Sequence, residues 1–290
     1  MKILITGGNG FIGKNLYYQL RNKYDIEIPS KIELDLLNTE EVEQYFKAKK
    51  IDIVIHAANI NDVKNKGVTA YSVLDGNLRM FNNLQRCHNY YEKMYYFGSG
   101  AEYDSQNYIP LMKEEYFDTY VPNDSYGFSK YIMSKACDHT SNIYDLRLFG
   151  VYGRYEEWER RFISNTICRV LKGKDILIHK NIYFDYLWVG DLGNIIQWFI
   201  CNTPKYHHYN VCTGRRIDLY SLAGIIKKVM EVNCSIHIEE NGLKREYTGD
   251  NTRLLDEIGN YEFIDLEYSI LELTEFYKRH IHEINENKLI

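Results

Sequence analysis

A phenol and an ammonium group stand four residues apart, at Tyr126 and Lys130, in the stretch Tyr-Gly-Phe-Ser-Lys. On a helix, residues i and i+4 share one face, so both side chains can point into one site. The pKa of a free phenol is about 10, and a nearby ammonium group stabilises the phenolate and lowers that pKa. An isolated Tyr–Lys pair of this kind would usually lie on a solvent-exposed helix face. If both side chains instead point into a binding site, the pair predicts acid–base chemistry by Tyr126.

A glycine-rich turn near the start of the chain could bind a phosphate group. Gly7-Gly8-Asn9-Gly10-Phe11-Ile12-Gly13 follows an apolar run and opens a helical pattern. We expect Gly7 to allow the tight turn, Gly10 to let the backbone approach a pyrophosphate, and Gly13 to permit close packing of helix on strand. Free N–H groups at the helix N-terminus attract the same anion. The sequence predicts dinucleotide binding by Gly7, Asn9, Gly10, Phe11, Ile12 and Gly13.

The elements that must position these groups alternate in the first half of the chain. Such alternation predicts an α/β fold, a Rossmann-type doubly wound parallel sheet with helices on both faces. The expected strands are 2–6, 25–28, 51–56, 94–97 and 144–149, and the expected helices are 11–21, 39–49 (with Thr39 as N-cap), 77–89 and 126–139.

The alternation breaks after Tyr152. We expect the rest of the chain to form a smaller C-terminal α/β lobe that binds substrate at the carboxyl edge of the sheet. The predicted dinucleotide-binding part comprises residues 1–153, with 186–203 returning to it. The predicted substrate-binding lobe comprises 154–185 and 204–290.

Bulk properties exclude several classes of function. The 290 residues carry a net charge of −5 with the charges scattered, which argues against a nucleic-acid binder. The apolar runs are too short for a signal peptide or a membrane span. The six cysteines form no C-x-x-C pair, so neither a metal site nor a disulfide scaffold is indicated. We expect a cytoplasmic protein that has no metal, nucleic-acid or membrane partner.

The G-x-x-G-x-x-G spacing of the glycine turn, together with Tyr126 and Lys130, resembles the extended short-chain dehydrogenase/reductase family, also called the NAD-dependent epimerase/dehydratase family. In that family a Ser or Thr stands four residues before a Tyr, and Ser99 and Tyr103 match this pattern. Without the resemblance, Ser99 would be read as the cap of a turn. The resemblance implies that Ser99 orients a substrate carbonyl, Tyr126 transfers the proton, and Lys130 holds the nicotinamide ribose.

The same resemblance implies further cofactor contacts and a homodimer formed through two helices of each subunit. Members that bind NAD usually place an Asp at the end of the second strand. Here Glu27 is the acid near that point, and the chain leaves through Ser30 and Lys31, which could hold a 2′-phosphate. NADP is therefore the expected cofactor, with NAD as the alternative. The other implied cofactor contacts are Asp35, Leu36, Ala57, Ala58 and Asn77.

Two branches of the family remain open. Nucleotide-sugar 4,6-dehydratases carry Thr-Asp-Glu where this chain has Ser99-Gly100-Ala101, and glycine and alanine cannot transfer protons. One remaining branch is a 4-keto reductase similar to GDP-fucose synthase, and the other is a UDP-galactose-type 4-epimerase. The expected NADP favours net reduction. A regulator that binds nicotinamide without turnover is a third alternative, and the complete trio of Ser99, Tyr126 and Lys130 argues against it.

GDP-fucose synthases also epimerise, using a Cys and a His. Alignment places Ala101 and Arg161 at these two positions. We therefore expect reduction at C4 of a nucleotide-linked 4-keto-6-deoxyhexose without epimerisation at C3 and C5. The expected contacts with the nucleotide-sugar substrate are Ser99, Gly100, Arg161, Arg169 and Arg253.

Overall fold

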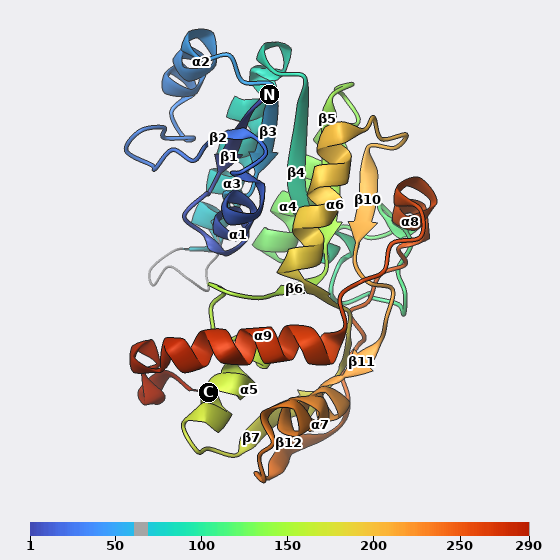
Figure 1. The fold of residues 1–290 in the computed structure, drawn as a ribbon. Coiled ribbons are helices and arrows are strands. Elements are labelled where there is room, and N and C mark those ends of the chain that lie inside the picture. Colours follow the sequence, from blue (N-terminus) through green and yellow to red (C-terminus); the bar gives the residue numbers. More distant parts are fainter. Residues whose placement is uncertain (61–68, 290) are drawn as a thin grey trace.

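The computed structural model describes residues 1–60 and 69–289. Its main sheet has six parallel strands in the order β10-β5-β4-β3-β1-β2 (Figure 1). The apolar residues of β1 and β3 are fully buried, as expected for a parallel sheet covered on both faces. The predicted doubly wound sheet is confirmed. Its strands are β1 (Lys2–Thr6), β2 (Asp25–Glu27), β3 (Ile53–His56), β4 (Lys93–Ser99), β5 (Ile143–Leu148) and β10 (His208–Val211).

Alternate residues of β1 enter two different cores. Ile3 and Ile5 pack into the core that also contains Leu16 of α1 and Ile196 of α6. Leu4, between them, packs on the other face against residues of α2, α3 and α4. The sheet is therefore a central layer, covered on one face by α1 (Phe11–Leu20) and α6 (Val189–Cys201) and on the other by α2 (Thr39–Ala48), α3 (Ala70–Arg86) and α4 (Ser125–Cys137).

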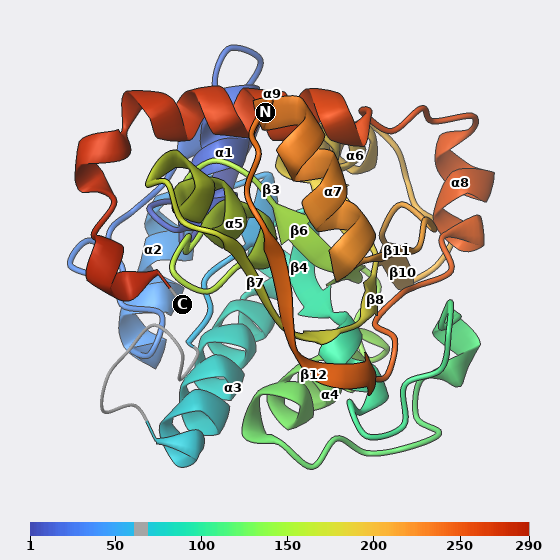
Figure 2. The ribbon, with the colours of Figure 1, turned by 90° about the horizontal axis from the view of Figure 1, so that it is seen from below.

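The C-terminal lobe lies beyond the carboxyl ends of the strands of the main sheet (Figures 1 and 2). Its core brings together Ile167, Leu222 and Ile270 from three helices. Short paired strands complete the lobe or join it to the main sheet. The strands of this part are β6 (Gly150–Tyr152), β7 (Ile176–Asn181), β8 (Tyr183–Phe184), β9 (Tyr186–Trp188), β11 (Ile217–Asp218) and β12 (Ile236–Leu243), and its helices are α5 (Phe162–Leu171), α7 (Leu219–Met230) and α9 (Leu266–Arg279). The short helix α8 (Thr252–Ile258) instead lies beside β10, and its Leu254 packs into the core of the main sheet (Figure 1).

Three details differ from the sequence prediction. The helix expected from Asn77 begins at Ala70, where Thr69 caps it by accepting the Ser72 N–H at 3.1 Å. The N-cap of α2 is Asn38 rather than Thr39, because the Asn38 side chain accepts two N–H groups of the first turn. Strand β10, assigned to the lobe from sequence, pairs with β5 and belongs to the main sheet. The division into a cofactor-binding part and a substrate-binding part otherwise stays a prediction.

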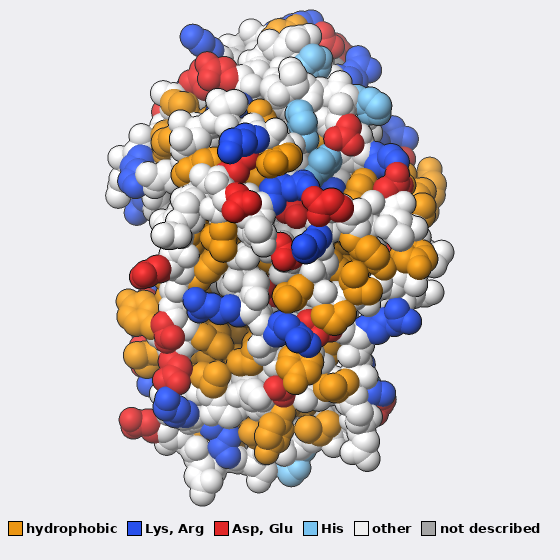
Figure 3. All heavy atoms as spheres, turned by 90° about the vertical axis from the view of Figure 1, so that its right-hand side faces the viewer, with side chains coloured by type: hydrophobic (Ala, Val, Ile, Leu, Met, Phe, Trp, Pro, Cys, Tyr) orange, Lys and Arg blue, Asp and Glu red, His pale blue; other side chains and the backbone are white. Residues whose placement is uncertain are grey.

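Figure 3 shows the face of the molecule to the right in Figure 1. Acidic and basic side chains are interspersed on it, and apolar side chains gather mainly on its lower half. Within the described ranges, the structure contains no helix with the length and apolar character that a membrane crossing requires.

Candidate active site

The glycine turn between β1 and α1 is possible only with glycine at two of its positions. Gly7 has φ +68°, a left-handed conformation, and a Cβ there would lie 2.7 Å from the Ala58 backbone. A Cβ on Gly13 would lie 2.4 Å from the Gly7 carbonyl oxygen. The Gly10 N–H donates to that same carbonyl at 2.9 Å and closes the turn. The backbone of this turn is therefore left open to a ligand that approaches closely.

The N-terminus of α1 offers donors to an anion. Gly10 is its N-cap, no side chain caps it, and its first turn contains no acidic residue. Asn9 and Gly10 are exposed at the tip of the turn, while Phe11 and Ile12 are partly buried behind it. Uncapped N–H groups at the positive end of the helix dipole suit a diphosphate. The predicted residues of the turn therefore fit the pyrophosphate of a dinucleotide.

The acid at the end of β2 is already engaged. The Glu27 carboxylate forms an ion pair with Lys49 and accepts a hydrogen bond from the Tyr45 hydroxyl. It is also 3.4 Å from the Lys2 ammonium group. Glu27 is therefore held by side chains of β1 and of the C-terminal end of α2.

Four residues predicted to contact the cofactor follow β2 in one loop, and two of them, Ser30 and Lys31, are those expected to select NADP. Lys31 is 75% exposed, and its ammonium group lies 3.9 Å from the Asp35 carboxylate. Ser30 is partly exposed and Leu36 is buried. The loop thus presents a cation and a hydroxyl close to the strand end, which is an arrangement compatible with a 2′-phosphate.

The residues after β3 lie against the glycine turn. The Ala57 N–H donates to the Thr6 carbonyl at 3.2 Å, and the Ala58 N–H lies 3.3 Å from the Thr6 hydroxyl. Asn77, predicted to contact the cofactor, is buried, and its amide forms two hydrogen bonds of 2.8 Å with the Ile60 backbone. Asn77 therefore fixes the course of the chain after β3.

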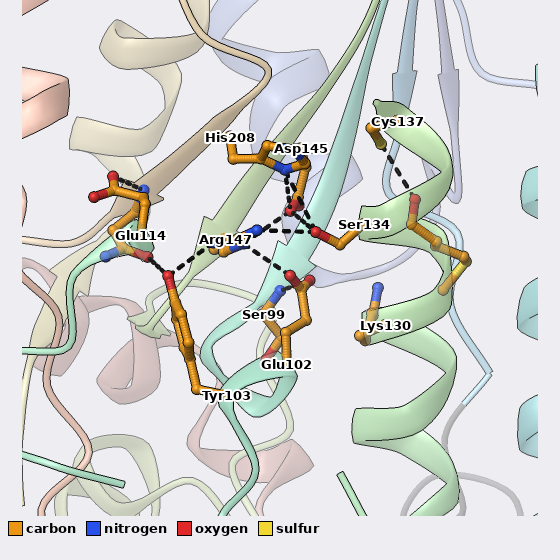
Figure 4. Close-up of polar contacts among 12 residues, drawn as sticks. Ser99, Glu102, Tyr103, Glu114, Lys130, Ser134, Cys137, Asp145, Arg147 and His208 are labelled. Atoms are coloured by element: carbon orange, nitrogen blue, oxygen red, sulfur yellow. Dashed lines mark hydrogen bonds and ion pairs between the residues drawn. The ribbon is translucent and has the colours of Figure 1, made fainter. Parts of the chain in front are cut away.

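The three predicted catalytic side chains come from two elements. Ser99 is the last residue of β4 and caps the short 3₁₀ turn Gly100–Tyr103. Tyr126 and Lys130 lie on α4, whose N-cap Asp124 accepts the Gly127 N–H at 2.8 Å. The Lys130 ammonium lies 5.7 Å from the centre of the Tyr126 ring, and the Ser99 side chain is a hydrogen-bonding neighbour of the Tyr126 phenol. The structure therefore brings the trio together; Figure 4 shows Ser99 and Lys130.

The charge states differ from the sequence expectation. Burial raises the pKa of Tyr126, and the Ser99 side chain and the charge of Arg161 only partly offset this. Burial lowers the pKa of Lys130 to about 8, and its ammonium donates to the Phe97 carbonyl at 2.7 Å. The expected lowering of the Tyr126 pKa by Lys130 is not found, because burial dominates. At neutral pH the phenol is protonated and ready to donate.

Tyr247, from the segment after β12, also reaches the serine turn, and sequence reasoning missed it. A Cβ on Gly100 would lie 2.7 Å from the Tyr247 hydroxyl, and the Ser99 side chain is a hydrogen-bonding neighbour of this phenol too. The Tyr247 ring packs against Tyr108 and Phe149, with ring centres 5.2 and 5.0 Å apart. One tyrosine among 27 carries no local signal that would have identified it.

The three predicted substrate arginines are not together. Arg161 immediately precedes α5, is exposed, and its charge lowers the pKa of Tyr126. Arg169 lies in the last turn of α5, roughly 12 Å further along the helix, and donates to the Asp175 carbonyl. Arg253 is held beside β10 by Glu115 and by the His208 carbonyl, so it does not join this group.

Comparison with known proteins shows relatives along nearly the whole chain. A GDP-6-deoxy-D-talose 4-dehydrogenase from Aggregatibacter actinomycetemcomitans is 27% identical, covering 98% of this chain and 100% of the relative. A GDP-L-colitose synthase from Yersinia pseudotuberculosis is 25% identical, covering 96% of this chain and 98% of the relative.

Solved structures share the fold. A GDP-L-fucose synthetase from Naegleria fowleri bound to NADP superposes with a TM-score of 0.84 at 16% identity, covering 97% of this chain and 93% of that one. A GDP-mannoheptose C4 reductase from Campylobacter jejuni with NADP bound superposes with a TM-score of 0.81 at 21% identity, covering 96% and 98%. A family model described as "NAD dependent epimerase/dehydratase family" matches residues 3–212. The chain therefore belongs to the NAD-dependent epimerase/dehydratase family.

Proposed function

We propose that this protein uses NADPH to reduce the C4 ketone of a nucleotide-linked 4-keto-6-deoxyhexose, in the biosynthesis of a surface-polysaccharide sugar. The observation that carries the proposal is the meeting of three groups from β4 and α4: a protonated phenol (Tyr126), a hydroxyl (Ser99) and a buried ammonium (Lys130). These groups suit proton donation to a carbonyl oxygen in a site that also holds a hydride donor.

The two relatives that span nearly the whole chain support a nucleotide-sugar substrate. Their names describe GDP-linked sugars, and one of them is a dehydrogenase acting at position 4. The exposed Lys31 and the pairing of Glu27 with Lys49 support NADPH, because the charge of the carboxylate at the end of β2 is already compensated by a lysine.

The proposed mechanism assigns each side chain one task. The glycine turn and the N-terminus of α1 would hold the pyrophosphate, and the reduced nicotinamide supplies a hydride when bound. Ser99 hydrogen-bonds to the substrate carbonyl and orients it. Tyr126 donates its proton to the carbonyl oxygen as the alcohol forms. Lys130 holds the nicotinamide ribose and stabilises the phenolate that remains.

The two positions that hold the epimerising Cys and His of GDP-fucose synthases carry no acid–base group in this chain. Ala101 has no ionisable side chain, and the Arg161 guanidinium has N–H donors but no atom that could accept a sugar proton. We therefore propose that C3 and C5 keep their configuration during the reduction.

The test is an assay of the purified protein with NADPH or NADH and 4-keto-6-deoxyhexoses linked to GDP, CDP, UDP or dTDP, run in D₂O. We expect NADPH to be consumed with one of the nucleotides and the product to contain no solvent deuterium at C3 or C5. Deuterium at either carbon would contradict reduction without epimerisation. If no ketone is reduced while added NAD supports interconversion of UDP-hexose C4 epimers, the protein is a 4-epimerase and the proposal is wrong.

A further inference from the structure

Two carboxylates share one guanidinium beneath the serine turn. Glu102 and Asp145 are both 0% exposed, and Arg147 is 1% exposed. The Arg147 Nε lies 2.9 Å from Glu102 Oε2 and 2.9 Å from Asp145 Oδ2 (Figure 4). Burying two anions against one cation is costly unless a further positive charge or a proton compensates.

Three of the four carboxylate oxygens have donors. Glu102 Oε1 accepts the Ser99 backbone N–H at 2.9 Å, and Glu102 Oε2 accepts from Arg147. Asp145 Oδ2 accepts from Arg147 and from the Ser134 hydroxyl at 2.7 Å, and the His208 ring lies 3.3 Å away. Asp145 Oδ1 is buried, and the described residues place no donor on it. An acceptor left in this state normally costs stability.

The oxygen without a donor faces the other carboxyl group across a glycine. A Cβ added to Gly98 would lie 2.0 Å from Asp145 Oδ1 and 2.4 Å from Glu102 Oε1. Both oxygens therefore crowd against the same point of the backbone of β4. Two ionised carboxylates this close repel each other, whereas one proton between them removes the repulsion and supplies the missing donor.

The nearby lysine does not supply that donor. The Lys130 side chain, from α4, is also buried, but its ammonium group donates its hydrogen bond to the Phe97 carbonyl. Across residues 1–60 and 69–289, Lys130 forms no ion pair with Glu102 or Asp145.

We propose that Glu102 and Asp145 share one proton between Glu102 Oε1 and Asp145 Oδ1, and that Glu102 is thereby a positioning residue for Ser99. The positioning role of Glu102 rests on the proposed function, whereas the shared proton does not depend on it. Burial and the charge of Asp145 raise the pKa of Glu102 well above that of an ordinary carboxyl group. Burial also acts to raise the pKa of Asp145, but Arg147, His208 and Ser134 outweigh it and hold that pKa at about 2.

The shared proton fixes the turn that presents the catalytic serine. With the proton in place, the Glu102 carboxyl holds the Ser99 N–H on one side and Arg147 on the other. Arg147 in turn donates to the Tyr103 hydroxyl at 2.9 Å, at the end of the same turn. Loss of the proton would drive the carboxylates apart and release the backbone of Ser99.

Other titratable groups face this pair from the elements packed around it, and their contributions must be separated by a control. They come from β4, the serine turn, α4, β5, β10 and the segment after β12. They are Tyr96, Tyr103, Tyr126, Lys130, Cys137, Arg147, His208 and Tyr247.

Asp145→Asn tests the proton directly. In this variant the amide oxygen of the new Asn accepts from Arg147 and Ser134. The amide nitrogen then takes the place of Oδ1 and donates an N–H toward Glu102 at every pH. The variant should fold and keep one anion opposite Arg147. Asp138→Asn is the matched control, because Asp138 is exposed and lies 2.6 Å from the far nitrogen of His208. The double variant Glu102→Gln/Asp145→Asn leaves Arg147 without an anionic partner. Its loss of unfolding free energy should be much larger than the sum of the losses in Glu102→Gln and Asp145→Asn.

The first readout is unfolding by denaturant between pH 5 and 9. The folded state keeps the proton up to a raised pKa, while the unfolded chain releases it near about pH 4. The unfolding equilibrium constant of the wild type, relative to that of Asp145→Asn, should therefore rise up to about tenfold per pH unit in this range. Asp138→Asn should follow the wild type. A ratio that does not change with pH, or an Asp145→Asn variant that does not fold, would overturn the proposal.

The second readout is kcat as a function of pH with the 4-keto substrate. The wild type should lose kcat at alkaline pH as the pair loses its proton, and Asp145→Asn should move this loss to higher pH. Glu102→Ala should lose kcat at all pH values. An alkaline loss at the same pH in wild type and Asp145→Asn would contradict the positioning role. If none of these proteins reduces a ketone while the unfolding result holds, the proposed function fails and the shared proton stands.

Discussion

Each reactive side chain of the candidate site takes its properties from the residues that bury it. The Tyr126 phenol has its pKa raised by burial, and the Lys130 ammonium has its pKa lowered to about 8 by the same cause. Ser99 is fixed through its backbone N–H by Glu102, while its hydroxyl accepts the Ala101 N–H at 3.2 Å. The arrangement keeps a proton on the phenol and a cation beside it, which is the state that the proposed reduction requires before hydride transfer.

Tyr126→Phe should lower kcat/KM by about 10²–10⁴-fold, because the ring remains but the proton donor is lost. NADPH affinity should change little, since the glycine turn and Lys130 are untouched. Steady-state kinetics and a direct titration of NADPH measure the two quantities. Tyr131→Phe is the matched control on the same helix, because its hydroxyl bonds to Asp118 outside the site. Wild-type turnover in Tyr126→Phe would rule out Tyr126 as the acid.

Residues of the candidate site that belong to a local sequence motif could be predicted. Residues that only the folded chain brings to the site could not. Tyr126 and Lys130 could be found because a helix sets their spacing. Glu102 and Asp145 gave no signal, since only the pairing of β4 with β5 brings them together. The contact of Arg253 with Glu115 at the edge of the sheet could not be predicted either, because no local pattern indicates it.

At the scale of the elements, helix α1 packs closely against the glycine turn that precedes it. Its first turn touches the Gly7 backbone, so the helix and the phosphate-binding turn form one unit. The strands of the main sheet were predictable, because buried parallel strands are continuous apolar runs. The start of α3 was not, because Gly76 lowers helix propensity there. A Cβ at Gly76 would lie 2.4 Å from the end of the Ile60 side chain, so glycine lets that side chain pack directly on the helix.

Gly13→Ala and Gly224→Ala should change stability in opposite directions. The new methyl group at residue 13 meets the Gly7 carbonyl, so the helix must shift, costing about 1–3 kcal/mol and weakening NADPH binding. Gly224 lies within α7 with nothing within 4 Å of its added Cβ, so alanine should stabilise by up to about 1 kcal/mol. Denaturant unfolding and a cofactor titration check both variants. Normal NADPH binding by Gly13→Ala would mean that this turn does not hold the cofactor.

At the scale of the whole molecule, the main sheet carries the residues predicted to bind the cofactor, and a segment far along the chain reaches the same place. Ser99 stands at the carboxyl end of β4, and Tyr247 covers it from the segment after β12. The fold class could be predicted because the alternation of strands and helices is local. The place of β10 in the sheet could not, since its partner β5 lies some sixty residues earlier and the pairing depends on the assembled core.

The most direct test of the account follows the hydride itself. The protein would be supplied with NADPH deuterated at C4 of the nicotinamide and with the nucleotide-linked 4-keto-6-deoxyhexose that it consumes, and the product would be analysed by NMR. The account predicts one deuterium at C4 of the sugar for each NADPH oxidised. A sugar product without deuterium at C4, formed while the NADPH stays intact, would contradict it.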